Sequence, residues 1–182
     1  MLADPSAAVS VRPAVAADAP AIGAVQARAW RQAYRELLPG PVLAELTADR
    51  FADAWRPAIT DPPSPRHRVL VACSGDFVVG FAAVAPRADR DAAPGDGELV
   101  ELLVDPAHQG GGHGSRLLAA ATDTLRETGA LTVAVWTPVA DEARLAFLGA
   151  AGLQPDGARR TLASPDGTQA EQLRLVAAFG QA

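Results

Sequence analysis

A cluster of four glycines, at positions 110, 111, 112 and 114, separates an expected strand from an expected helix. The strand covers residues 98–104, and the helix that follows carries apolar side chains three or four residues apart and ends near Gly129. Glycines at such a junction leave backbone N–H groups unobstructed at the positive end of a helix dipole, where a phosphate group binds well. A turn alone requires fewer glycines, so the pattern predicts an anion-binding loop in an α/β protein.

The features that the loop lacks narrow the choice of anion. A dinucleotide-binding loop has glycines at relative positions one, three and six, but the sixth position is Ser115 counted from Gly110 and Leu117 counted from Gly112. A P-loop needs a lysine after its glycines, and all 16 basic residues of this chain are arginine. The lack of lysine also excludes a mechanism through a lysine Schiff base.

The rest of the chain alternates strand-like and helix-like segments, which favours a layered α/β or α+β domain over a helical bundle or a β-sandwich. We expect one domain over residues 9–182, preceded by a flexible segment 1–8. Prolines predict a rigid connection at 57–65, and the composition of 86–97 predicts a mobile loop. The expected strands are 9–13, 68–72, 77–84, 98–104, 131–136 and a hairpin over 158–176 that turns at 165–167; the expected helices are one capped by Asp18, one over about 42–55 and one after Gly114.

Composition and charge exclude several classes of function. A net charge of -5 over 182 residues argues against a nucleic-acid surface, which needs clustered positive charge. No run approaches the roughly 20 apolar residues of a membrane span. The one cysteine, Cys73, rules out an internal disulfide and a cysteine-based zinc site, and the three histidines lack metal-ligand spacing. We therefore expect a cytoplasmic protein without a metal ion, in which Cys73 is a small buried side chain.

The segment around the glycines resembles the GNAT superfamily of N-acetyltransferases. The resemblance rests on Val104-Asp105-Pro106 after the strand, on Gln109-Gly110-Gly111-Gly112-His113-Gly114, and on the paired leucines 117 and 118 in the helix. It implies an α/β fold with a mixed, largely antiparallel sheet flanked by helices. It also implies an enzyme that transfers an acetyl group from acetyl-CoA to a primary amine, either of a small molecule or of a peptide. The oligomeric state stays open, with a homodimer as the common default among soluble proteins.

The same resemblance implies where acetyl-CoA binds. Its pyrophosphate would lie on the backbone of the glycine-rich loop, and backbone N–H groups near the end of the strand would hold the thioester carbonyl. We expect the side chain of His113 to lie over the loop, exposed to solvent. The residues expected to bind acetyl-CoA are Leu103, Val104, Gln109, Gly110, Gly111, Gly112, His113, Gly114 and Ser115.

Two positions after the next strand depart from the family's pattern. Asp141 stands where the family has asparagine, and Leu148 stands where it has a tyrosine that commonly protonates the departing sulfur. A thiol with a pKa of about 8.5 leaves as thiolate near neutral pH at a cost of roughly 1 to 2 kcal/mol, so this loss slows the reaction without abolishing it. Tyr34, the only tyrosine in the chain, is the one phenol that can substitute. An acyl-CoA-binding regulatory or inactive domain stays open as the alternative.

The transfer also requires a general base, because a primary amine with a pKa of about 10.4 is mostly protonated at pH 7. The resemblance places Glu98 where several family members carry their catalytic glutamate. Glu101 lies three residues further along and points to the opposite face of a regular strand, unless a bulge changes the parity. Both candidates stay open, as does the simpler interpretation that these glutamates only reach solvent.

Overall fold

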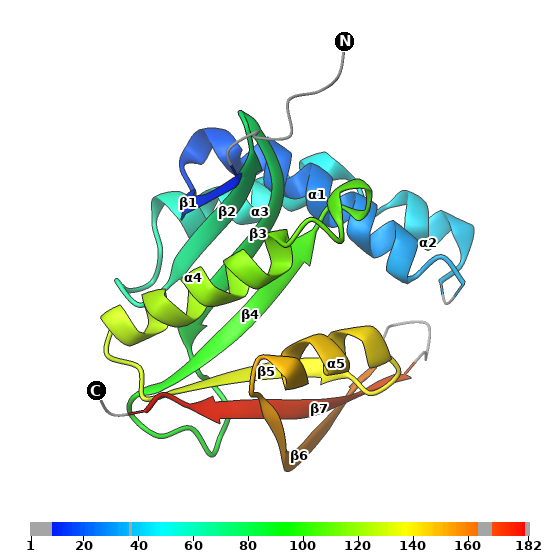
Figure 1. Ribbon diagram of the computed structural model, residues 1–182. Coiled ribbons are helices and arrows are strands. Elements are labelled where there is room, and N and C mark those ends of the chain that lie inside the picture. Colours follow the sequence, from blue (N-terminus) through cyan, green and yellow to red (C-terminus); the bar gives the residue numbers. More distant parts are fainter. Residues whose placement is uncertain (1–8, 37, 164–168, 181–182) are drawn as a thin grey trace. The chain divides into compact units, whose positions relative to one another are not determined.

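Strands and helices alternate along the chain much as the sequence predicts (Figure 1). The computed structural model describes residues 9–36, 38–163 and 169–180, so the expected flexible segment 1–8 and the expected turn at 165–167 lie outside the described residues. The strands are β1 (Val9–Pro13), β2 (Arg68–Ser74), β3 (Phe77–Pro86), β4 (Asp96–Val104), β5 (Thr132–Pro138), β6 (Gln154–Ala163) and β7 (Gln169–Ala178). The helices are α1 (Ala19–Ala33), α2 (Gly40–Ala44), α3 (Ala48–Thr60), α4 (His113–Glu127) and α5 (Glu142–Ala150), with short 3-10 turns η1 (Ala16–Asp18) and η2 (Pro106–His108).

The described strands form a seven-stranded sheet in the order β1-β2-β3-β4-β5-β7-β6. Strands β4 and β5 pair in parallel. The β1–β2, β2–β3, β5–β7 and β6–β7 pairs are antiparallel. The predicted α/β class, with a mixed, largely antiparallel sheet and flanking helices, is confirmed.

The segment expected to form one helix over about 42–55 forms two. Helix α2 ends at Ala44, and α3 begins after Thr47, whose hydroxyl accepts a hydrogen bond from the backbone N–H of Arg50 at 3.3 Å. Pro57, expected in a rigid connection, lies inside α3 instead. A proline near a helix end removes one intrahelical hydrogen bond, and the packing of Trp55 and Ile59 against the core offsets that loss.

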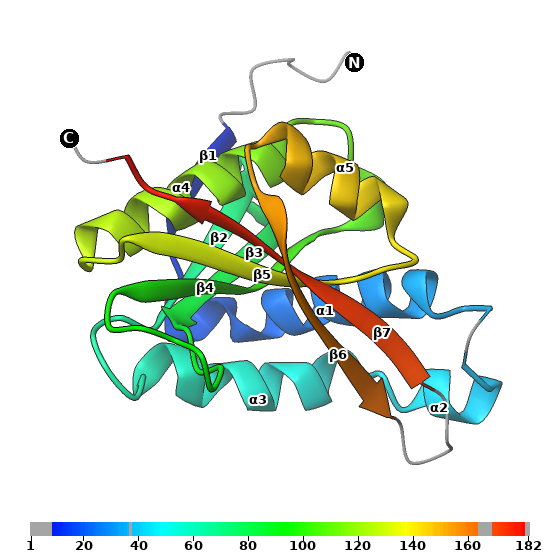
Figure 2. The same cartoon turned by 90° about the horizontal axis from the view of Figure 1, so that it is seen from below.

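Contacts divide the chain into two compact units, and each is described by itself. The first comprises Met1–Val84 with Glu101–Thr124. In it, α1 and α3 lie on one face of β2 and β3, and α4 lies on the other (Figure 2). Phe81 of β3 and Ile22 of α1 are fully buried in the core between these helices and the sheet. Burying a side chain of this size contributes about 2 kcal/mol, so this core holds α1 firmly on the sheet.

Helix α1 packs closely on α3 at one residue, Gly23. A Cβ on Gly23 would collide with the backbone of Ala48 and Ala52, so only glycine allows this approach. About two turns further along α1, the ring of Trp30 contacts the ring of Phe51 edge to face, with 5.3 Å between centroids. This contact fixes the C-terminal end of α1, which carries Trp30, against α3.

The second unit comprises Ala85–Val100 with Leu125–Ala182. In it, Glu98 of β4 pairs with Ala134 of β5, and Trp136 of β5 pairs with Arg174 of β7. Side chains alternate between the two faces of a strand, and the β5 residues 133, 135 and 137 on one face are fully buried. The opposite face carries Glu98, Trp136 and Arg174, so one side of this part of the sheet is polar.

Candidate active site

The glycine-rich loop has the backbone that the sequence predicts. It connects η2 to α4, and Gly110 and Gly112 adopt φ values of 79° and 77°, a region that favours glycine. The helix that follows begins at His113, so its first backbone N–H groups have no partner within the helix and point toward the loop. The loop therefore fits a phosphate or pyrophosphate group on its backbone.

Asp105 fixes the start of this loop. Its side chain is buried, accepts a hydrogen bond from the backbone N–H of Ala107 at 3.0 Å, and accepts another from Nε of Arg28 in α1 at 2.7 Å. Burial alone would raise the pKa of this carboxyl, but the Ala107 N–H and the Arg28 guanidinium together hold the pKa below its usual range. Asp105 thus stays ionised and ties α1 to the loop.

His113 lies inside the first unit, so the prediction of an exposed histidine over the loop is wrong. The residue is 6% exposed, and its Nδ1 is buried without a hydrogen-bond partner among the described residues. Burial, and then electrostatic interactions with His108 and Arg116, lower the pKa of the His113 ring and favour its neutral form. His113 is the first residue of α4, and the first turn of this helix directs its side chain into the first unit.

The side chain of Arg116, which belongs to the first turn of α4, lies against the loop. Its Nη1 donates a hydrogen bond to the carbonyl oxygen of Gly111 at 3.2 Å, and a Cβ built on Gly112 would lie 2.7 Å from the same atom. The loop therefore carries a guanidinium beside the exposed backbone N–H groups, which adds positive charge where the sequence predicts an anion.

The two strand glutamates have different surroundings. In the first unit, Oε1 of Glu101 accepts a hydrogen bond from the backbone N–H of Leu102 at 3.1 Å. In the second unit, Glu98 is half-buried, and burial followed by the charge of Asp89 raises the pKa of its carboxyl. The guanidinium of Arg160 and the backbone N–H of Ala88 oppose this increase. The carboxylate of Glu98 therefore binds a proton more readily than that of an exposed glutamate.

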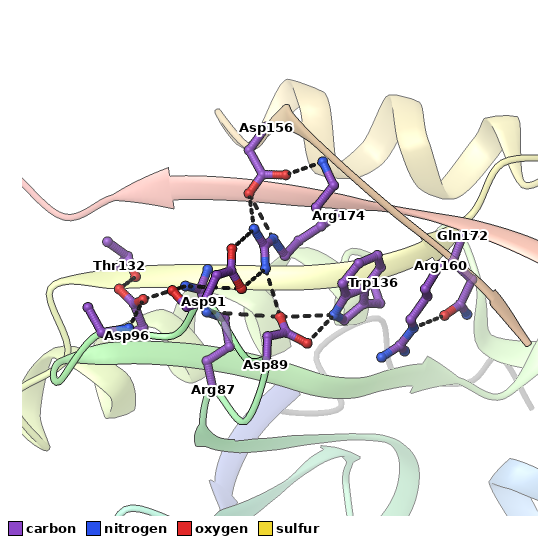
Figure 3. A network of polar contacts seen from close by, with 12 residues as sticks. Arg87, Asp89, Asp91, Asp96, Thr132, Trp136, Asp156, Arg160, Gln172 and Arg174 are labelled. Atoms are coloured by element: carbon purple, nitrogen blue, oxygen red, sulfur yellow. Dashed lines mark hydrogen bonds and ion pairs between the residues drawn. The ribbon is translucent and has the colours of Figure 1, made fainter.

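A network of charged side chains lies in the same unit as Glu98 (Figure 3). At its centre, the buried guanidinium of Arg174 contacts Asp91 through two hydrogen bonds of 2.8 and 2.6 Å, Asp89 at 2.9 Å and Asp156 at 2.7 Å. Nearby, Arg87 pairs with Asp96 at 2.6 Å. These contacts hold the loop between β3 and β4, so the expectation that this loop is mobile finds no support in the structure.

The other residues singled out from the sequence are Tyr34, Asp141, Leu148 and Cys73, and each has a different environment. The ring of Tyr34 follows α1, half-buried, and contacts Trp30 edge to face at 5.8 Å between centroids. Asp141 caps α5, because its carboxylate accepts the backbone N–H of Arg144 at 3.0 Å, a role that asparagine also fills. Leu148 is 1% exposed and belongs to the core of the second unit, and Cys73 is buried as expected.

The sequence analysis missed Asp89, Trp136 and Arg174. One signal for them lies in the sequence of β7, where Arg174 stands between Leu173 and Leu175. An arginine in an apolar strand needs acidic partners if it is buried. The acidic residues of the loop after β3 are the partners, but only the register of β5 with β7 shows that they meet. Within the described residues no three His, Cys, Asp or Glu side chains are grouped to hold a metal ion. Nor does any helix in that part of the chain have the length and apolar character to cross a membrane.

Comparisons with known proteins point to one family. Residues 27–152 match the family described as Acetyltransferase (GNAT) family. Over 135 residues, 72% of this chain and 82% of the relative, the chain is 36% identical to N-alpha-acetyltransferase RimI of Mycobacterium tuberculosis. The structure of PaiA N-acetyltransferase from Thermoplasma acidophilum in complex with coenzyme A aligns with a TM-score of 0.75 at 13% identity, over 94% of this chain and 99% of that one. The structure of YncA from Salmonella typhimurium with acetyl-CoA aligns with a TM-score of 0.71 at 20% identity, over 96% of each chain.

Proposed function

Because this chain belongs to the acetyltransferase (GNAT) family and is an acetyl-CoA-dependent N-acetyltransferase, we propose that it acetylates the α-amine of a peptide with Glu98 as the general base. The observation that carries the choice of base is the position of Glu98, half-buried on the polar face of the second unit with its pKa raised by burial and by Asp89. The choice of acceptor follows the relative at 36% identity, which is named as an N-alpha-acetyltransferase.

Glu98 acts on the acceptor in this proposal. Its carboxylate takes a proton from the acceptor ammonium, directly or through a water molecule, and leaves a neutral amine that can attack. A carboxylate whose pKa lies above its usual range is a stronger base than an exposed glutamate. Glu101 is the second candidate for the same role, and the Gln variants of the two residues separate them.

The other proposed roles belong to the first unit. When bound, acetyl-CoA supplies the acetyl group as a thioester. The backbone N–H groups from Gln109 to Ser115, together with Arg116, fit its pyrophosphate, and those of Leu103 and Val104 are proposed to orient the thioester carbonyl. Tyr34 is the proposed proton donor to the sulfur, in place of the phenol absent at Leu148.

The choice of acceptor is tested with three amines at equal concentration: a short peptide with a free N-terminus, the same peptide N-terminally blocked and carrying one lysine, and a linear polyamine. We expect kcat/KM for the free N-terminus to exceed both others by about tenfold or more, about 1.4 kcal/mol of transition-state stabilisation. Because the enzyme has no lysine, acetyl-lysine in the product comes only from the peptide. Equal or better turnover of the blocked peptide or the polyamine would overturn the acceptor assignment without affecting the assignment of the base.

Gly112→Val should weaken binding of coenzyme A by about tenfold or more, about 1.4 kcal/mol. The valine side chain would stand at a φ of 77° that disfavours it, beside Arg116, and would cover the backbone N–H groups of the loop. Isothermal titration of coenzyme A measures the change. Gly149→Val in α5 is the control, since a Cβ there meets nothing within 4 Å. An unchanged affinity for coenzyme A in a folded Gly112→Val protein would contradict the assignment of the pyrophosphate to this loop.

A further inference from the structure

Asp89 lies in the loop between β3 and β4, and two strands hold its carboxylate in place (Figure 3). Its Oδ2 accepts a hydrogen bond from Nη1 of Arg174 in β7 at 2.9 Å. The indole Nε1 of Trp136 in β5 donates to both carboxylate oxygens, each at 3.3 Å. Arg174 is itself buried, so the sheet fixes the position of Asp89 together with Arg87 of the same loop, whose Nε lies 3.9 Å from Oδ2 of Asp89.

The polar face that holds Asp89 is also the face of Glu98. Glu98 pairs with Ala134 in the parallel register of β4 and β5, and Trp136 is two residues further along β5. Residues two apart on a strand point to the same side, and paired residues share that side, so Glu98 and Trp136 lie on one face. The residue before Asp89 contributes as well, because the backbone N–H of Ala88 favours the ionised form of Glu98.

We propose that Asp89 is a positioning residue for the reaction: clamped by Trp136 and Arg174, it holds a second carboxylate beside Glu98 and makes Glu98 a stronger base. This inference rests on the proposed role of Glu98. It extends that role, because it assigns a task to the charged network that the transfer of an acetyl group does not otherwise use. Asp89 does not contact the reacting atoms in this proposal and acts only through Glu98.

The charged groups around Glu98 act in opposite directions. Burial and then Asp89 raise its pKa, whereas Arg160, the Ala88 N–H and Arg87 lower it. Arg160 reaches this face from β6: its guanidinium stacks on the ring of Trp136, 4.3 Å from the centroid, and its Nε donates to Gln172 at 2.7 Å.

The remaining charges of the network leave the influence of Asp89 in place. Arg87 is largely neutralised by Asp96, which pairs with it at 2.6 Å. Arg174 is shared among Asp89, Asp91 and Asp156, so one positive charge faces three carboxylates. Within the network, four carboxylates face the two guanidinium groups of Arg87 and Arg174. Of these carboxylates, Asp89 is the one whose charge raises the pKa of Glu98.

Two substitutions that each remove one charge separate this proposal from a purely structural role. Asp89→Asn removes the negative charge, so the acid limb of the pH profile of kcat/KM should move to lower pH and kcat at its plateau should fall about threefold, because a weaker base transfers the proton less readily. Arg160→Gln removes the positive charge and should move the same limb to higher pH. Arg159→Gln is the matched control, because Arg159 is an exposed neighbour on β6 that pairs with Glu171 and should move neither limb nor plateau.

A carboxyl ¹³C NMR titration of Glu98, assigned by the signal lost in Glu98→Gln, gives a readout that does not depend on turnover. We expect the Glu98 titration to move down in Asp89→Asn and up in Arg160→Gln, in step with the kinetic limbs. An unmoved Glu98 titration in Asp89→Asn would overturn the inference while the assignment of the base stands. A titration that moves while the kinetic limb does not would overturn the assignment of Glu98 as base and the inference with it. If Asp89→Asn fails to fold, Trp136→Phe decides instead, because it removes the indole N–H that holds Asp89 and keeps an aromatic ring. A Glu98 titration and a kinetic limb that both move to lower pH support the positioning role, and unmoved ones contradict it.

Discussion

Arg174→Met is expected to lower the free energy of unfolding by about 3 kcal/mol. The guanidinium is buried and bonded to Asp89, Asp91 and Asp156, so its removal deprives three carboxylates of their shared cation. Asp89 and Asp91 keep only the longer ion pairs with Arg87, at 3.9 Å each, among the described residues. Breaking a buried ion pair by removing one partner costs roughly 3 to 5 kcal/mol, and the low end applies because Asp91 is 59% exposed and water can solvate it. Urea denaturation of parent and variant measures the difference.

Arg159→Met provides the control on the same hairpin. Arg159 pairs with Glu171 at 2.8 Å, but both side chains are more than half exposed, and such surface pairs contribute about 0 to 1 kcal/mol. The pH dependence adds a second check. Hydrogen bonding to Arg174 lowers the pKa of Asp91 to about 2, and a lowered carboxyl pKa stabilises the fold above the pKa of the unfolded chain. The gap between parent and Arg174→Met should therefore narrow as the pH falls from about 4 to about 2, and equal stabilities at pH 7 would contradict the role assigned to Arg174.

Local features of the chain were predictable from the sequence. The strand, glycine-rich loop and helix around Gly110 and Gly112 follow from residues close together in the sequence, and both glycines have the positive φ that favours this residue type. The expected strands 68–72 and 77–84 likewise form, as β2 and β3, and the structure extends β2 to Ser74 and β3 to Pro86. Where short-range steric preferences decide the conformation, the sequence is informative.

Three other features were not predictable in the same way, and the last of them depends on distant partners. The break between α2 and α3 at Thr47 is set by a cap that competes with a continuous apolar pattern. The inward position of His113 depends on the residue at which α4 begins, and helix starts are uncertain by one or two residues from sequence alone. The network around Arg174 joins residues more than 80 positions apart in sequence, and a change of one residue in the register of β7 would turn Arg174 to the other face.

Glu98→Gln is expected to lower kcat/KM at neutral pH by about 100-fold, or about 2.7 kcal/mol. Glutamine keeps the size and polarity of the side chain but has no basic oxygen, so the acceptor must lose its proton to water. The affinity for coenzyme A should change little, because the residues proposed to bind it lie from 103 to 115. Titration calorimetry on the same protein checks that point, and steady-state kinetics with the free-N-terminus peptide gives the rate.

The pH dependence of this variant distinguishes loss of a base from loss of structure. In the parent, kcat/KM should rise as pH increases through the pKa of Glu98, which burial and Asp89 raise above its ordinary value. In Glu98→Gln that limb disappears, and activity instead climbs with pH as the free fraction of an amine with a pKa near 8 increases. Glu101→Gln, whose side chain accepts the N–H of Leu102, should retain the parent's acid limb and lose less activity. If Glu101→Gln abolishes the limb and Glu98→Gln keeps it, the base is Glu101, and Glu98 is a buried carboxyl whose raised pKa serves no step of the transfer.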